Sequence, residues 1–182
     1  MNIVIISGSP RHNSLTVRVA QHLQTYLSEH YPQHNTDLLD VRQHHLPPIQ
    51  NPFASVEQAP TKWQDLASTM LTADAFILVS PEYNGSYSSA MKNLLDHFPK
   101  FSRRVFGIAT ASPGAMGGMR AAMQMQQMVA AFLGILSPQM LVVPTIDKKF
   151  GEHGKLIDST FEKSVQSFIH EFIWLADAVT QK

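Results

Sequence analysis

Apolar runs typical of buried strands alternate along the chain with apolar residues at helical spacing. The runs at residues 3–6 and 75–79 are uninterrupted, and each ends at serine and proline residues, which predicts strands covered on both faces of a parallel sheet. Further strands are predicted at residues 36–41, 105–109 and 139–143. Helical spacing predicts helices at residues 14–30, 61–72, 88–97, 117–133 and 161–176.

The chain thus repeats a unit of strand, turn and helix. This order predicts a doubly wound parallel α/β sheet with right-handed crossovers and helices on both faces. Residues 42–60 are rich in Pro, Gln, Asn and His without a period, which predicts a long surface loop. A length of 182 residues fits a single domain spanning residues 1–182, since no linker, repeat or low-complexity segment divides the chain.

Composition narrows the possible chemistry. The chain has 14 basic and 14 acidic residues, so no charge excess indicates a nucleic-acid partner. It has no cysteine, so redox activity would need a cofactor. His30 and His34 have a metal-ligand spacing, but Pro32 interrupts the helix between them and no metal site is predicted. No apolar stretch reaches the ~20 residues of a membrane span and no signal peptide is evident, so we expect a cytoplasmic protein without a membrane partner.

In an open α/β sheet, ligands bind beyond the carboxyl ends of the strands, near the point where the strand order reverses. The first loop there (residues 8–16) reads Gly-Ser-Pro-Arg-His-Asn-Ser-Leu-Thr and leads into a helix. Its backbone N–H groups, its hydroxyls and Arg11 would suit a phosphate monoester, because the signatures of dinucleotide folds and P-loops are missing. A plain turn with Asn13 or Ser14 as helix N-cap is the alternative, although it gives Arg11 no role.

Two further loops follow predicted strands. The second loop (residues 80–87) reads Ser-Pro-Glu-Tyr-Asn-Gly-Ser-Tyr and combines turn formers with an aromatic ring and an amide, which would suit a flat heteroaromatic ligand. The third loop (residues 111–118) is rich in glycine and opens a helix, so bare backbone could approach a ligand closely. Its alternative interpretation is an ordinary flexible connection.

Together these segments resemble the NADPH-dependent FMN reductase family of the flavodoxin-like superfamily, which includes quinone, chromate and azo-dye reductases. The family pattern P-E-Y-N followed by K-N is matched by Pro81-Glu82-Tyr83-Asn84 and Lys92-Asn93. The patterns G-S-x-R-x-x-S and S-P-G-x-x-G-G are matched within the first and third loops. Ser88-Ser89 and Asp96-His97 depart from the pairs Pro-Gly and Asp-Trp that are common in relatives.

The resemblance implies a flavodoxin-like sheet of strand order 2-1-3-4-5 that binds FMN without a covalent bond. For the FMN phosphate it implies contacts from Ser9, Arg11, Ser14, Leu15 and Thr16. For the isoalloxazine ring it implies contacts from Pro81, Glu82, Tyr83, Asn84 and Gly85 on one side and from Ser112 and Gly114 on the other. The implied reaction passes hydride from NADPH or NADH through FMN to a small-molecule acceptor (a quinone, azo dye, nitro compound, metal oxyanion or free flavin), with no catalytic side chain.

Two other functions fit a flavin site: a flavodoxin-like electron carrier, and a flavin-binding regulatory module without turnover. Electron carriers of this fold are usually strongly acidic, so the balanced charge of this chain favours the enzyme. The fourth predicted helix carries apolar residues over more of its circumference than a single core stripe needs, among them Met116, Met119, Met123, Met125 and Met128. We therefore predict a homodimer or homotetramer.

Overall fold

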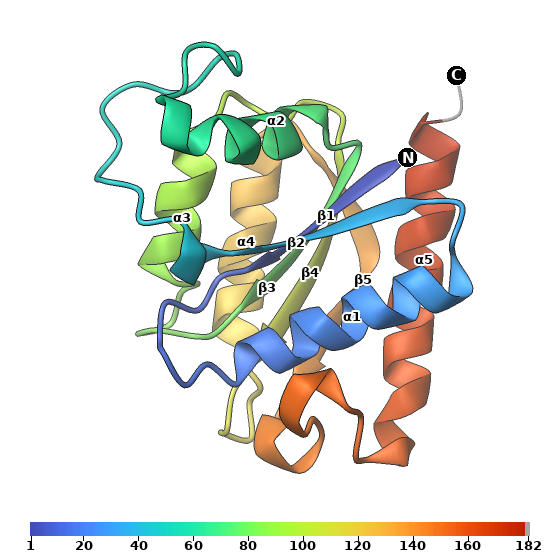
Figure 1. The fold of residues 1–182 in the computed structure, drawn as a ribbon. Coiled ribbons are helices and arrows are strands. Elements are labelled where there is room, and N and C mark those ends of the chain that lie inside the picture. Colours follow the sequence, from blue (N-terminus) through green and yellow to red (C-terminus); the bar gives the residue numbers. More distant parts are fainter. Residues whose placement is uncertain (181–182) are drawn as a thin grey trace.

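Parallel strands form one sheet in the computed structural model, which describes residues 1–180 (Figure 1). The strands are β1 (Asn2–Ser7), β2 (Asn35–Asp40), β3 (Ala75–Ser80), β4 (Val105–Ala111) and β5 (Ile135–Val143). Their order, β2-β1-β3-β4-β5, confirms the predicted sheet. The apolar residues of β1 and β3 are almost entirely buried, which explains why these sequences show no alternation of polar and apolar positions.

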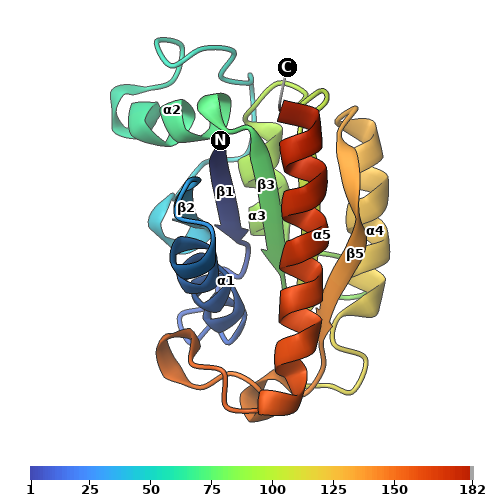
Figure 2. The same cartoon turned by 90° about the vertical axis from the view of Figure 1, so that its right-hand side faces the viewer.

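Helices cover both faces of the sheet (Figures 1 and 2). They are α1 (Thr16–His30), α2 (Gln64–Thr72), α3 (Ser89–Asp96), α4 (Met119–Ala131) and α5 (Glu162–Thr180). Helices α1 and α5 pack on one face, and α2, α3 and α4 pack on the other. None of the helices within residues 1–180 is both long enough and apolar enough to cross a membrane.

The carboxyl ends of β1, β3 and β4 lie side by side. Ser7 pairs with Val79, and Val79 pairs with Ala109. The arrows of β1 and β3 both point downward in Figure 2, toward the edge where residues 8–16 leave the sheet. The first, second and third loops therefore start from the same edge, as the sequence predicts.

The predicted start of the fifth strand at residue 139 is wrong, because β5 begins at Ile135. Pro138 lies inside this strand, where the pairing with β4 shifts: Phe106 pairs with Leu136, but Ile108 pairs with Met140. Proline has no N–H to donate to a neighbouring strand, so it normally indicates that a strand has ended. Strand β5 lies at the edge of the sheet, and an edge strand can accommodate proline where its pairing is irregular.

Helix α4 begins at Met119, two residues later than predicted. Gly117 and Gly118 have left-handed φ angles of +61° and +88°, so they cannot belong to the helix. A side chain at Gly117 would place its Cβ 2.7 Å from the backbone nitrogen of Pro144. These glycines are therefore required where the third loop passes close to the end of β5.

The prediction that residues 42–60 form only a surface loop is wrong in part. Residues Val41–Gln43 form a 3-10 turn, and Phe53 is only 8% exposed. The Phe53 ring lies 5.2 Å from that of His97 and 5.9 Å from that of Phe98, between centroids. The Phe53 N–H donates to the His97 carbonyl oxygen at 2.6 Å. One aromatic residue thus fixes the loop to the core, a long-range contact that leaves no periodic pattern in the sequence.

Candidate functional site

A cavity of about 130 Å³ lies at the carboxyl edge of the sheet between the three loops. Its lining residues are Ser9, Arg11, Asn13, Ser14, Leu15, Thr16, Pro81, Glu82, Tyr83, Ala111, Ser112, Pro113 and Ile146. All of the site residues predicted from the sequence are among them except Asn84, Gly85 and Gly114. The cavity therefore joins the loop predicted to bind phosphate to the loops predicted to bind an aromatic ring.

Hydroxyl groups and the start of α1 form the part of the cavity that is predicted to bind phosphate. Ser9, Ser14 and Thr16 are buried, at 2%, 7% and 4% exposure. The Ser14 hydroxyl accepts the N–H of Val17 at 3.2 Å, so the alternative of a capping serine is correct for this one bond. Because α1 begins at Thr16, the positive end of its dipole also lies at the cavity.

Arg11 and Tyr83 meet across the cavity. The guanidinium carbon of Arg11 lies 4.7 Å from the centroid of the Tyr83 ring, a cation–π contact. The Tyr83 hydroxyl is buried without a hydrogen-bond partner in the part of the chain that the structure describes. A buried hydroxyl in this state is free to bond a polar ligand.

The first loop leaves β1 in a fixed direction. The Gly8 N–H donates to the Val79 carbonyl oxygen at 2.8 Å, and the Ser88 hydroxyl donates to the Gly8 carbonyl oxygen. A Cβ at position 8 would lie 2.5 Å from the Met91 Cε atom, so glycine allows α3 to pack directly on the loop. Ser88, where relatives commonly have proline, thus ties the first loop to the start of α3.

The second loop contains a tight two-residue hairpin. Tyr83 and Ser86 exchange backbone hydrogen bonds of 2.8 and 3.1 Å. Asn84 and Gly85 between them have φ angles of +50° and +82°, as in a type I′ turn. Asn84 is exposed at the tip, which explains why Asn84 and Gly85 lie outside the cavity lining.

Glu82 connects the second loop to α4. Its Oε2 atom accepts the backbone N–H groups of Arg120 and Ala121 at 3.1 and 3.4 Å. Its Oε1 atom lies 3.5 Å from the Arg120 guanidinium. The carboxylate therefore satisfies N–H groups at the start of α4 that have no partner inside the helix. This contact between distant segments was not predicted from the sequence, which indicated only a ring contact for Glu82.

The third loop is held by the chain that follows β5. The Ser112 hydroxyl accepts the Gly114 N–H at 3.0 Å, and the Ser112 carbonyl oxygen accepts the Ile146 N–H at 3.2 Å. Ile146 is fully buried and lines the cavity. One signal in the sequence could have indicated that Ile146 lines the cavity: the fifth strand ends just before it, at the same edge of the sheet as the other strands. Gly114 is exposed and lies outside the lining, and its contact with the ring stays a prediction.

The cavity fits the phosphate end of FMN better than the complete molecule. Buried hydroxyls, Arg11 and a helix N-terminus supply the donors that a phosphate monoester needs without a metal ion. Its volume of about 130 Å³ lies below the roughly 300–1,000 Å³ typical of ligand pockets. The ring would therefore extend past Tyr83 onto the surface formed by the second and third loops.

A larger cavity, of about 420 Å³, lies on the other side of the first loop between Pro10, the 3-10 turn and α3. Six of its lining residues are apolar: Pro10, Val41, Leu46, Pro48, Ala90 and Leu94. Asn93, from the K-N pair of the family pattern, donates to the carbonyl oxygens of Leu46 and Pro47. Asn93 thus fixes residues 46–47 to α3, and this larger cavity lacks the combination of Arg11, buried hydroxyls and the start of α1 that the smaller one has.

Comparison with known proteins gives the same answer as the geometry. A family model for NADPH-dependent FMN reductase matches residues 1–147. An FMN-dependent NADPH-azoreductase of Staphylococcus aureus is 28% identical over 181 residues, covering 95% of this chain and 94% of the relative. The structure of FerB, a flavoenzyme NAD(P)H:(acceptor) oxidoreductase from Paracoccus denitrificans, has a TM-score of 0.77 at 21% identity and covers 97% of both chains. A Pseudomonas aeruginosa flavodoxin variant has a TM-score of 0.59 at 17% identity, covering 95% of this chain and 99% of the flavodoxin.

The strand order and the loops at the carboxyl edge define a protein of the flavodoxin-like fold. Within this fold, the chain belongs to the NADPH-dependent FMN reductase family. The enzyme class, the FMN cofactor and the NAD(P)H co-substrate predicted from the sequence are thereby confirmed. An electron carrier or a regulatory module without turnover does not fit this membership.

The position of Glu82 yields a prediction. Glu82→Gln keeps an oxygen that can accept a helix N–H, so this variant should retain most of its kcat. Glu82→Ala removes the acceptor and should lower the free energy of unfolding by about 0.5–2 kcal/mol, the range for a lost helix cap. Steady-state kinetics and thermal unfolding of both variants measure these effects. If Glu82→Gln instead lost ~10²–10⁴-fold in kcat with FMN bound, Glu82 would be a general acid or base.

Proposed function

We propose that FMN binds at this cavity with its phosphate against the first loop and its ring along the second and third loops, and that the acceptor is a small, flat conjugated molecule such as an azo dye or a quinone. The observation that carries the proposal is the convergence of buried hydroxyls, Arg11 and the start of α1 on one cavity. The azo acceptor is supported by the Staphylococcus aureus relative, which is named as an azoreductase.

The phosphate would be held by Ser9, Arg11, Ser14, Thr16 and the backbone N–H groups around Leu15. A terminal phosphate carries close to two negative charges, and a guanidinium together with a helix N-terminus balances most of them. Arg11 is exposed and stacks on Tyr83, so it can turn toward the phosphate without leaving a buried partner.

The ring would be bordered by Pro81, Glu82 and Tyr83 on one side and by Ser112 on the other. Asn84, Gly85 and Gly114 would act through the shape of their loops, because they lie outside the cavity lining. Bound FMN supplies the redox chemistry by accepting hydride from NAD(P)H and passing electrons to the acceptor. The protein contributes orientation and fixed backbone dipoles, and no side chain in the cavity is assigned as an acid or base.

The proposal is tested on the purified protein. It should be yellow, release FMN on denaturation, and oxidise NADPH or NADH when an azo dye, a quinone, a nitro compound or free flavin is the acceptor. Release of stoichiometric FAD, or no FMN affinity after reconstitution, would contradict the proposed site. Turnover with free flavin but with no azo dye or quinone would contradict only the proposed acceptor class.

Arg11→Ala should weaken FMN binding by about 1.5–3 kcal/mol, the range for a hydrogen bond to a charged group. The fold should remain intact because Arg11 is exposed. Titration of the flavin-free protein with FMN measures the dissociation constant. Arg104→Ala is the matched control, since Arg104 pairs with Asp74 beyond the opposite ends of the strands. An unchanged Kd for Arg11→Ala would show that the phosphate binds elsewhere.

We further propose that the chain forms a homodimer or homotetramer through α4. Met125 and Met128 are buried under this helix, but Met116, Met119 and Met123 are 59%, 38% and 50% exposed. Exposed methionines present an adaptable apolar surface that a second copy of the chain could cover. That copy would lie next to the cavity, because Glu82 connects α4 to the second loop. The cytoplasmic location predicted from the sequence stays a prediction.

Light scattering at micromolar concentration tests this assembly. We expect at least twice the 20.3 kDa of one chain, and a shift toward monomer for Met119→Glu combined with Met123→Glu. Trp174→Glu is the control, because Trp174 is 58% exposed but lies on α5, on the other face of the sheet. A mass near that of one chain with full activity would disprove the proposed oligomer.

A further inference from the structure

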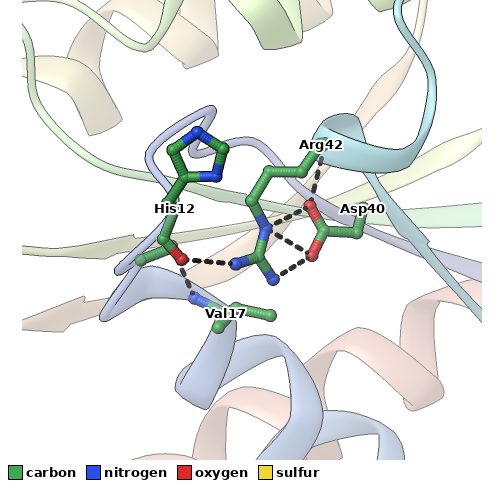
Figure 3. Close-up of polar contacts among 5 residues, drawn as sticks. His12, Val17, Asp40 and Arg42 are labelled. Carbon is green, nitrogen blue, oxygen red and sulfur yellow. Dashed lines mark hydrogen bonds and ion pairs between the residues drawn. The ribbon is translucent and has the colours of Figure 1, made fainter.

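Two charged residues at the end of β2 approach the first loop from outside the cavity. Asp40 is the last residue of β2, and its side chain is 8% exposed. The Arg42 Nε atom lies 3.0 and 2.9 Å from the two carboxylate oxygens of Asp40, and a second guanidinium nitrogen bonds the same group (Figure 3). Asp40 also accepts the backbone N–H of Arg42 at 3.0 Å. These bonds fix the guanidinium in one orientation.

The remaining guanidinium nitrogen, Nη1, donates to the carbonyl oxygen of His12 at 3.0 Å (Figure 3). His12 lies in the middle of the first loop. The two ends of that loop are held by Gly8 bonding Val79 and by Ser14 bonding Val17. Among the hydrogen bonds of residues 1–180, only the one from Arg42 joins residues 9–13 to a segment outside the loop. Apart from the contact of the Arg11 side chain with the Tyr83 ring, the middle of the loop is therefore held from outside by Arg42.

This contact also affects the field at the cavity. A carbonyl oxygen that pointed into the cavity would repel a bound anion. The His12 carbonyl oxygen points at Arg42 instead, and neither His12 nor Arg42 lines the cavity. The hydrogen bonds that Arg42 donates to the Asp40 carboxylate raise the pKa of Arg42 above its ordinary value, so the guanidinium keeps its charge. The arrangement leaves the donors of Ser9 and Arg11 on the cavity side of the loop.

We propose that Arg42 is a positioning residue for the FMN phosphate. Arg42 holds the first loop in its binding conformation through the His12 carbonyl oxygen, and Asp40 holds Arg42 in place. The proposal rests on the phosphate site proposed above. It assigns a function to two residues that lie outside the family's sequence patterns and do not contact the cavity.

Paired flavin titrations test the role of Arg42. Arg42→Gln should weaken FMN binding by about 5- to 30-fold, the factor that a loss of one or two kcal/mol in loop positioning produces. Riboflavin has the same ring but no phosphate, so its Kd should stay within about twofold. Arg104→Gln, which removes an Arg–Asp pair beyond the opposite ends of the strands, should change neither constant. Equal weakening of both flavins would indicate general destabilisation and overturn the proposal, as would an unchanged FMN affinity.

Hydrogen–deuterium exchange of the flavin-free protein gives a readout that needs no cofactor. Arg42→Gln should raise amide exchange in residues 9–16, while Arg104→Gln should not. Unchanged exchange in the loop would overturn the role of Arg42 even if FMN binds as proposed. If the wild-type protein failed to bind FMN while the loop responded to Arg42→Gln, the phosphate site would be wrong and the Arg42–His12 contact would remain correct.

Two further variants test whether Asp40 and Arg42 act together. Asp40→Asn should weaken FMN binding, but adding it to Arg42→Gln should cause no further loss, because Asp40 acts only through Arg42. Arg42→Lys should recover part of the affinity at most, since an ammonium group cannot reach the carboxylate and the carbonyl oxygen with the same planar geometry. Additive losses in the double variant would contradict the proposed coupling.

Discussion

Parallel pairing of β1, β3 and β4 is the constraint on which the site depends. Parallel strands end at one edge of a sheet, so the three loops that follow them must meet there, and α1 and α4 must begin nearby. The pairing is stable because the central strands are buried beneath two layers of helices. A site that combines phosphate donors with a ring-binding surface thus follows from the topology, before any single side chain is considered.

Each loop is then fixed by a bond from a different segment. Ser88 holds the first loop at Gly8, Glu82 holds the second loop against α4, and Ile146 holds the third loop at Ser112. These bonds satisfy backbone groups that would otherwise be unpaired where the chain leaves regular structure. Loop rigidity here comes from contacts between distant residues, and a ligand that binds these loops meets donors that are already in place.

The sequence patterns were sufficient for the central strands and for the three loops, because buried strands and turn residues leave strong local signals, and the strand order followed from the resemblance to the family. The patterns were insufficient where a distant contact decides the structure. The fifth strand was predicted to begin only at residue 139, although β5 begins at Ile135 and its irregular pairing accommodates Pro138. Phe53 gave no periodic signal for its burial. Arg42 could not be linked to the first loop, since its partner His12 is 30 residues away.

The charges around the cavity explain how a chain of zero formal net charge can favour an anion. Arg42 is paired with Asp40 and Arg120 with Glu82, so these arginines stabilise loops without adding net charge to the site. Arg11 forms no ion pair with any residue in the range 1–180. Its contact with the Tyr83 ring keeps the guanidinium beside the cavity while leaving its N–H donors free for a phosphate. Arg11 thus places an unpaired positive charge beside the cavity, as the phosphate site proposed above requires.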